Sequence, residues 1–175
     1  MSALTIPVSD QDHAQGPADA PCTLVEYGDF QCPHCRAAEQ AIRRLRRHFG
    51  DRLRFVFRNF PLTRIHPYAQ SAAETAEFAA SHDRFWEMHH LIFKNQDRLD
   101  VDLFIELAAE LNLDTAELTR ALDKGTFAGR VRSDFTGGVR SGVNGTPTFF
   151  VNGQRHNGSF EFDRLVEAVE EVLRS

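Results

Sequence analysis

Two cysteines separated by two residues carry the clearest chemical signal in this sequence, in the run Cys32-Pro33-His34-Cys35. A β-rich segment precedes the run and a helical pattern follows it, so Cys32 is expected at a helix start, where unpaired backbone N–H groups stabilise a thiolate. Pro33 suits the first helical position because it has no N–H. The spacing lets both sulfurs bond. It predicts a redox-active dithiol, with Cys32 the exposed nucleophile and Cys35 the buried resolving thiol.

His34 lies between the two cysteines and gives the motif a direction. Its side chain can donate a hydrogen bond or carry a positive charge beside Cys32, and both effects favour the thiolate over the thiol. A more stable thiolate makes the disulfide more oxidising. Motifs of this kind span reduction potentials from about −270 mV to about −120 mV. The Pro-His pair favours the oxidising end of that range.

A zinc site is the competing interpretation of the same motif, because one Cys-x-x-Cys pair supplies half of a tetrahedral site. The histidines that could complete it are His66, His82, His89, His90 and His156. The sequence has no second pair at ligand spacing, and adjacent histidines such as His89 and His90 point to different faces of a helix. We therefore expect no metal and no cofactor besides the Cys32-Cys35 disulfide itself.

The segments around the dithiol predict how it is positioned. Residues 23–27 and 53–60 are β-rich and flank a helical pattern at 33–49, which gives a β-α-β unit with parallel strands. Helical periodicity follows at 68–78, 85–93, 103–111, 118–122 and 127–139, with Asp100 and Asp114 as helix caps. Strands at 148–151 and 154–156 flank Asn152-Gly153, which suits a hairpin turn, and a last helix covers 161–173 with Ser159 available as a cap.

The order of these segments predicts an α/β fold, β-α-β then β-β-α, with an all-helical insertion. We divide the 175 residues into an N-terminal arm (1–20), a core (21–62 and 142–175) and the insertion (63–141). The arm forms at most a short edge strand at residues 4–8. A hydrophobic content of 42% lets the chain bury a core without covalent staples.

Charge and targeting signals narrow the possible partners. A formal net charge of −5 gives no basic field of the kind that binds nucleic acid or anionic lipid. The N-terminus lacks the pattern of a secretory leader, and no apolar run approaches the roughly 20 residues of a membrane span. As written, the chain is expected in the cytoplasm without stable membrane insertion; if a leader was removed, it belongs in the periplasm or another extracytoplasmic compartment.

Residues 26–35, Glu-Tyr-Gly-Asp-Phe-Gln-Cys-Pro-His-Cys, together with Gly145-Thr146-Pro147-Thr148, resemble the DsbA-like branch of the thioredoxin superfamily. The resemblance implies a thioredoxin-like fold with a cis peptide bond between Thr146 and Pro147 beside the dithiol, where a strand edge takes up an extended segment of a partner protein. It also implies that Glu26 is a buried acid. Burial would raise the pKa of Glu26, so that it could exchange a proton through water with Cys35; a solvated Glu26 is the alternative.

The expected activity is disulfide exchange with protein or peptide thiols, through a mixed disulfide at Cys32. A redox recycling partner is required, and a monomer suffices. The Pro-His pair argues for an oxidant, while the missing leader argues for reducing surroundings. In the proteins that this chain resembles, the residue at the position of Thr146 differs between oxidases and isomerases or reductases, so it does not decide the direction. The alternatives are a cytoplasmic reductase or isomerase, a non-catalytic peptide-binding or chaperone-like module, and a kappa-type glutathione transferase.

Two further residues have simpler expectations. Cys22 begins the strand that ends near Cys32, and it is too far along that strand to reach the dithiol. We expect a small buried hydrophobe there, with regulatory oxidation or intermolecular pairing as the alternatives. We expect three aromatic residues, Trp86, Phe85 and Phe93, in the core of the helical insertion, with a substrate cage as the alternative.

Overall fold

The computed structural model describes residues 2–175; Met1, the first residue of the predicted arm, lies outside them. One mixed sheet has the strand order β1-β3-β2-β4-β5. Its strands are β1 (His13–Gln15), β2 (Cys22–Gly28), β3 (Leu53–Asn59), β4 (Thr148–Val151) and β5 (Gln154–His156). Strands β2 and β3 are parallel, and β4 runs antiparallel to both β2 and β5. The predicted β-α-β and β-β-α units are therefore confirmed, as is the helical insertion between them.

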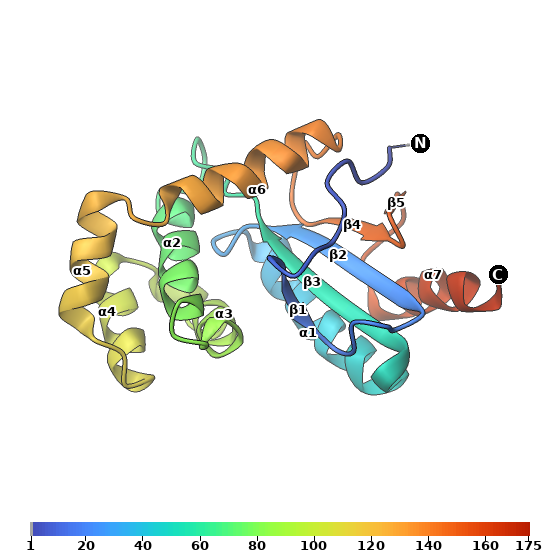
Figure 1. Ribbon diagram of the computed structural model, residues 1–175, viewed down its shortest axis with the longest axis horizontal. Coiled ribbons are helices and arrows are strands. Elements are labelled where there is room, and N and C mark those ends of the chain that lie inside the picture. The colour runs from blue at the N-terminus through green and yellow to red at the C-terminus, as the bar shows by residue number, and fades with distance from the viewer. Residues whose placement is uncertain (1) are drawn as a thin grey trace.

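The described part of the chain contains seven α-helices. They are α1 (Pro33–Phe49), α2 (Ala69–Ala80), α3 (Phe85–Lys94), α4 (Val101–Glu110), α5 (Thr115–Lys124), α6 (Ala128–Arg140) and α7 (Phe162–Arg174). Figure 1 shows α2 to α5 grouped beyond one end of the sheet, with α6 returning from them to the core. Short 3-10 turns lie at Gly50–Arg52 (η1) and Gln96–Arg98 (η2). The dithiol is on the strand-to-helix turn between β2 and α1.

Local signals set most of the helix ends. The carboxylates of Asp100 and Asp114 accept the backbone N–H groups of Leu103 and Glu117, so both predicted caps are confirmed. Ser159 was expected to cap the last helix, and this was wrong by two residues. Glu161 is the residue that precedes α7, and the Ser159 hydroxyl accepts its backbone N–H at 3.1 Å instead.

Alternating side chains of the central strands build a core on each face of the sheet. Leu24 and Phe57 belong to the larger cluster, which α1, α7 and the insertion complete. Val25 and Tyr27 belong to a smaller cluster on the other face, which α6 and the N-terminal arm cover. Because side chains alternate along a strand, Glu26 points to the same face as Leu24, beneath α1. The sheet therefore aims this carboxyl toward the helix that carries the dithiol.

The edge strand of the N-terminal arm lies at His13–Gln15, antiparallel to β3, and not at residues 4–8 as predicted. Residues 4–8 pack over the smaller core cluster, and the backbone carbonyls of Ile6 and Pro7 accept hydrogen bonds from Arg58. The Arg58 side chain thus binds backbone carbonyls that a neighbouring strand would otherwise bind. The sequence pattern located a strand in the arm without the contact that decides its position.

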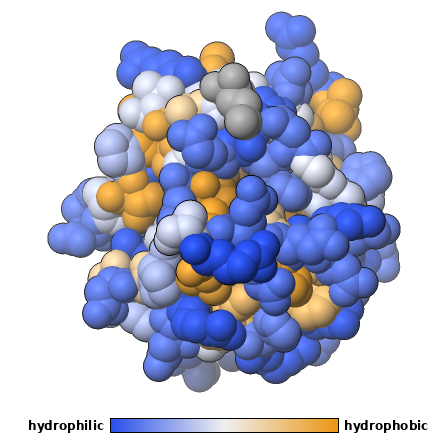
Figure 2. Space-filling view, turned by 90° about the vertical axis from the view of Figure 1, so that its right-hand side faces the viewer, coloured by the Kyte–Doolittle hydropathy of each residue, from blue (hydrophilic) through white to orange (hydrophobic). Residues whose placement is uncertain are grey.

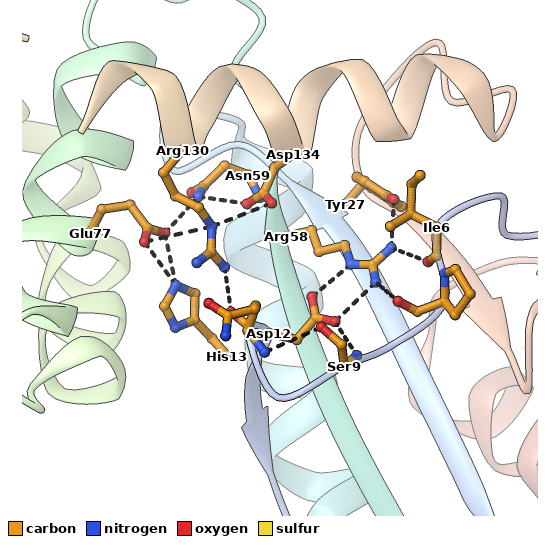
Figure 3. Close-up of polar contacts among 12 residues, drawn as sticks. Ile6, Ser9, Asp12, His13, Tyr27, Arg58, Asn59, Glu77, Arg130 and Asp134 are labelled. Atoms are coloured by element: carbon orange, nitrogen blue, oxygen red, sulfur yellow. Dashed lines mark hydrogen bonds and ion pairs between the residues drawn. The ribbon is translucent and has the colours of Figure 1, made fainter. Parts of the chain in front are cut away.

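Arg58, on β3, is the centre of a buried cluster that fixes the arm (Figure 3). Its side chain is 4% exposed, and it bonds both carboxylate oxygens of Asp12 at 2.8 and 3.0 Å. The Tyr27 hydroxyl accepts a further bond at 2.9 Å. With the two carbonyls of the arm, all five guanidinium donors have an acceptor. This cluster holds the arm against the sheet.

A second polar cluster, beside the first in Figure 3, joins the sheet to the insertion. Glu77 of α2 accepts from the side chains of His13 and Asn59, each at 2.8 Å. Asp134 of α6 accepts from Asn59 at 3.0 Å and lies 3.6 Å from the Arg130 guanidinium. Residues from β1, β3, α2 and α6 thereby meet in one network, which fixes the insertion relative to the sheet.

The face of the molecule drawn in Figure 2 is mainly polar. Figure 2 shows a face on which hydrophilic side chains dominate and apolar ones gather in small, separate groups. Within residues 2–175, none of the helices combines the length and apolar character that crossing a membrane requires.

Candidate active site

Cys32 occupies the N-cap of α1, with extended backbone angles, and Pro33 takes the first helical position as predicted. The Cys32 carbonyl accepts the first helical hydrogen bonds, from the N–H groups of Cys35 (3.1 Å) and Arg36 (3.2 Å). Cys32 is less exposed than predicted, at 4%, while Cys35 is fully buried. The order of exposure of the two thiols is as expected, but Cys32 is itself buried and not exposed.

The surroundings of the Cys32 sulfur favour its thiolate. A hydrogen bond with the Cys35 thiol is the largest influence and lowers the pKa of Cys32, against the opposing effect of burial. Contacts with Thr146 and with the backbone N–H groups of His34 and Cys35 lower this pKa further, to about 5. The Thr146 carbonyl, 3.7 Å from the sulfur, is not one of these stabilising contacts, because it can accept a hydrogen bond only from the protonated thiol. At neutral pH Cys32 is therefore an anion.

The second thiol of the pair is in the opposite state. Burial raises the pKa of Cys35 well above its ordinary value, and the neighbouring Cys32 and Glu26 raise it further. The Asp29 N–H group donates to the Cys35 sulfur at 3.4 Å, which is the one contact that opposes this. All three cysteines, including the fully buried Cys22, are free thiols in the structure. A thiolate and a protonated thiol thus lie within one helical turn.

Glu26 is buried, at 2% exposure, on the β2 strand beneath α1. Burial raises the pKa of Glu26 to about 8, and the charges of Glu39 and Cys32 add to this effect. One oxygen of its carboxyl has no hydrogen-bond partner in the described residues. Glu26 and Glu39 line a cavity of about 230 Å³, together with the buried His89. Water could fill that space and connect the carboxyl to the surface.

The loop before β4 closes the other side of the site. The peptide bond between Thr146 and Pro147 is cis, and the Thr146 carbonyl faces the Cys32 sulfur. The Asn152-Gly153 turn has positive φ at both residues, as the predicted hairpin requires. His34 is exposed, and its ring meets that of Phe160 edge-on at 6.3 Å. The two sequence motifs, separated by more than 100 residues, therefore lie side by side.

Asp29 was not among the sequence candidates, although it stands three residues before Cys32. Its carboxylate is fully buried and accepts from the N–H groups of Gln31 (2.8 Å) and Leu62 (2.9 Å) and from His66 Nδ1 (2.7 Å). A buried acid with three donors orders the chain around it. Its position between the β-rich segment and the Cys32–Cys35 motif was a usable signal, whereas the position of its partner His66 was not.

The histidines considered as zinc ligands lie apart. His66 pairs with Asp29, His82 with Glu117 and His90 with Glu39, while His156 bonds the Ser159 carbonyl. His89 is buried among the rings of Phe30, Phe57, Phe85, Trp86 and Phe93. Among residues 2–175, no group of three or more His, Cys, Asp and Glu side chains is arranged to hold a metal ion.

Fold and site together define a DsbA-like member of the thioredoxin superfamily. The structure of BdbD from Bacillus subtilis is similar, with a TM-score of 0.89 and 26% sequence identity over 99% of both chains. α-DsbA1 from Wolbachia pipientis shares the fold, with a TM-score of 0.83 and 19% identity over 97% of this chain and 94% of that one. The five-stranded mixed sheet and the helical insertion are common to these structures.

The chain belongs to the family described as Thioredoxin, whose sequence model matches residues 8–171. A relative named Na⁺/H⁺ antiporter NhaA 3, from Salinispora tropica, is 45% identical over 173 residues, which are 98% of this chain and 26% of that protein. A second, NhaA 1 from Salinispora arenicola, is 47% identical over 167 residues, which are 95% of this chain and 26% of that protein. The chain therefore spans about a quarter of the length of these relatives.

Proposed function

We propose that this protein exchanges disulfides with protein thiols through Cys32 and Cys35, and that it acts as an oxidant. The observation that carries the proposal is the contrast between the two thiols of one turn: a pKa near 5 for Cys32 and a raised pKa for the buried Cys35. Cys32 is an attacking or leaving thiolate at neutral pH, whereas Cys35 stays protonated and unreactive until the mixed disulfide forms.

In the oxidising direction, a partner thiolate attacks the Cys32 sulfur of the Cys32-Cys35 disulfide. The new bond joins the partner to Cys32, and Cys35 leaves with the electron pair as a thiolate. A second partner thiolate then attacks the partner sulfur of the mixed disulfide and releases Cys32 as a thiolate. The partner loses two electrons and gains a disulfide, while the protein is reduced to the dithiol.

Glu26 supports this exchange as a proton donor in our proposal. The departing Cys35 thiolate is buried and takes up a proton, because its pKa lies well above neutral. Glu26, with its pKa near 8, is mostly protonated at neutral pH and can give that proton through water. Solvent then returns a proton to Glu26 through the cavity that it lines.

The partner segment would bind beside Pro147 and Thr146. Pro147 precedes β4 and has no N–H, so an extended segment can approach the Cys32 sulfur along this edge. His34 is exposed at the mouth of the site and would contact the same partner. No group besides the Cys32-Cys35 disulfide is needed to carry electrons.

The low pKa of Cys32 favours an oxidant over a reductant. A stable Cys32 thiolate stabilises the reduced form of the protein, so the Cys32-Cys35 disulfide oxidises partner thiols more readily. The same chemistry runs in reverse as a reductase where the surroundings and the recycling partner supply two electrons. It runs as an isomerase, with no net electron transfer, where they keep the dithiol reduced. An oxidant belongs in an extracytoplasmic compartment, and a reductant in the cytoplasm.

The decisive experiment is an equilibrium titration of the dithiol in glutathione buffers, followed through the fluorescence of the single tryptophan, Trp86, and by trapping thiols for mass analysis. An oxidant should give a potential near about −120 mV, and a reductant near about −270 mV. Cys32→Ser should abolish oxidation of a reduced test protein. Cys35→Ser, first converted by glutathione disulfide to the Cys32-glutathione mixed disulfide, should accumulate a mixed disulfide with the test protein as glutathione thiolate leaves. An unreactive wild-type dithiol would reject the proposal and favour a peptide-binding module.

The named relatives suggest a second, narrower candidate: a partner protein in the membrane. The segments that match this chain belong to proteins named Na⁺/H⁺ antiporters, at 45% and 47% identity. Cysteines of such an antiporter would then exchange with Cys32. Trapping with Cys35→Ser in cells should yield a mixed disulfide that contains the antiporter. Mixed disulfides that contain only unrelated proteins would reject this candidate and leave the general oxidant proposal intact.

A further inference from the structure

Gln96 of the helical insertion contacts the dithiol loop directly. It opens the η2 turn, immediately after α3, and its amide nitrogen donates to the backbone carbonyls of Phe30 (2.8 Å) and Cys32 (2.9 Å). Both partners are carbonyl oxygens, so only the NH₂ end of the amide can face them. One side chain therefore binds the chain on both sides of Gln31, the residue just before the nucleophile.

The Cys32 carbonyl receives an unusual number of donors. It already accepts the N–H groups of Cys35 and Arg36 at the start of α1, and Gln96 adds a third donor. Each donor withdraws negative partial charge from this oxygen, which belongs to the same residue as the reactive sulfur. The Phe30 carbonyl takes part in no other hydrogen bond of the loop described here, so its conformation depends on Gln96.

Other contacts from the insertion side reach the same loop and the first turn of α1. The side-chain oxygen of Gln31 accepts the Tyr68 N–H group at 2.7 Å, and Asp97 pairs with Arg36 at 3.2 Å. The Asp97 carboxylate is 86% exposed, and exposed ion pairs contribute little. Gln96 alone reaches the residue that carries the reactive sulfur, which separates it from these neighbours.

We infer that Gln96 is a positioning residue for the reaction: its amide fixes the Phe30–Cys32 backbone and favours the Cys32 thiolate through the carbonyl of the same residue. This inference rests on the proposed disulfide exchange. It makes the reactivity of Cys32, which lies in the thioredoxin-like core, dependent on a side chain of the helical insertion.

The test compares Gln96→Leu and Gln96→Glu with the wild type. Leu cannot donate, and a Glu carboxylate turns acceptors with negative charge toward the two carbonyls. We expect the midpoint of the pH profile for Cys32 alkylation to rise in Gln96→Leu and to rise further in Gln96→Glu. The equilibrium constant with glutathione should change toward a weaker oxidant in Gln96→Leu by at most about tenfold. That limit is the whole free energy of such hydrogen bonds, and only the part that differs between the thiolate and the disulfide moves the equilibrium.

The matched control is Asp97→Asn, the next residue in the same turn, which removes the Arg36 ion pair and should leave both readouts near the wild-type values. A role in folding alone would lower the thermal stability of the Gln96 variants without moving the alkylation midpoint, and that result would overturn the inference. An equal shift in Asp97→Asn would overturn it too, because it would indicate a non-specific charge effect. Gln96→Leu serves where the charged variant does not fold.

Failure of this inference is separable from failure of the proposed function. Alkylation reports on the Cys32 thiol itself and needs no protein substrate. A wild-type chain that oxidises no test protein would reject disulfide exchange, while the alkylation midpoints of the variants would still decide the role of Gln96.

Discussion

Two buried polar groups on neighbouring strands of the same sheet have opposite surroundings. Arg58, on β3, has an acceptor for each of its five donors, including both oxygens of Asp12. Glu26, on β2, points to the other face and has a carboxyl oxygen without a partner in the described residues. Arg58 is buried with all its hydrogen bonds made, whereas Glu26 is buried with a pKa of about 8, close to neutral pH.

The comparison teaches that burial by itself does not indicate a reactive group. Buried charges that are fully paired hold segments together, as Arg58 holds the N-terminal arm. A buried acid without its full set of partners is costly to keep, and it becomes useful where a proton must move. Whether a buried polar group has all its hydrogen-bond partners therefore distinguishes the face of the sheet that holds the arm from the face that carries the reaction.

The largest expected effect comes from breaking the Arg58 cluster. Arg58→Met removes the charge and leaves Asp12, Tyr27 and two backbone carbonyls without their donor. Removing one partner of a buried ion pair costs about 3–5 kcal/mol of unfolding free energy. Denaturant unfolding at neutral pH measures this loss, with Cys32 alkylation as a control that should not change. A loss below about 1 kcal/mol would mean that the arm is held by packing alone.

The next effect, on the other side of the comparison, has the opposite sign. The pKa of Glu26 is near 8 in the folded state and 4.5 in the unfolded state, so the unfolded chain ionises first. Glu26 thus costs nothing below pH 4.5 and destabilises the fold increasingly as the pH rises toward 8. Glu26→Gln removes this dependence, and its stability relative to the wild type should improve by about 3 kcal/mol between pH 4.5 and 7.

Unfolding curves of Glu26→Gln and wild type at several pH values check this prediction. A stability difference that does not vary with pH would show that Glu26 ionises at its ordinary pKa, and would remove it as the proton donor for Cys35. Reduction rates of the disulfide in the same two proteins provide the second readout. Slower protonation of Cys35 in Glu26→Gln would agree with the proposed role.

The smallest effect concerns the junction of sheet and insertion. Burial raises the pKa of Glu77, but hydrogen bonds and charges led by His13 outweigh it and lower that pKa overall. Such a group stabilises the fold above pH 4.5 and loses this contribution as the pH falls. His13→Gln should cost about 1–2 kcal/mol at neutral pH and make the protein less sensitive to acid, as measured by unfolding from pH 7 to 3. Unchanged acid sensitivity would assign the pH dependence to other groups.

Much of the fold was predictable because its signals are local. The α1 helix has the predicted bounds, since Pro33 suits its first turn and Gly50, with positive φ, ends it. Periodicity located the helices of the insertion to within a few residues. The edge strand of the arm was misplaced because an arginine about 50 residues away binds the carbonyls of residues 6 and 7.

The parts of the candidate site that consist of consecutive residues were predictable from the sequence. The resemblance implied that the Thr146-Pro147 pair lies beside the dithiol and that Glu26 is buried, and the structure has both features. The partners Asp29-His66 and Gln96 were missed because each contact joins segments that are more than 30 residues apart. A polar side chain that bonds a distant backbone leaves no periodic trace in a sequence.

Because Cys22 is completely buried, its reaction with a thiol reagent can report local opening of the sheet. Burial raises the pKa of this thiol to about 11, and it sits at the start of the central strand β2. A thiol reagent at neutral pH should therefore label the Cys32 thiolate first and reach Cys22 only when β2 detaches from the sheet. The slow labelling rate of Cys22 would measure the free energy of that opening in the unmodified chain, under conditions where no denaturant is present.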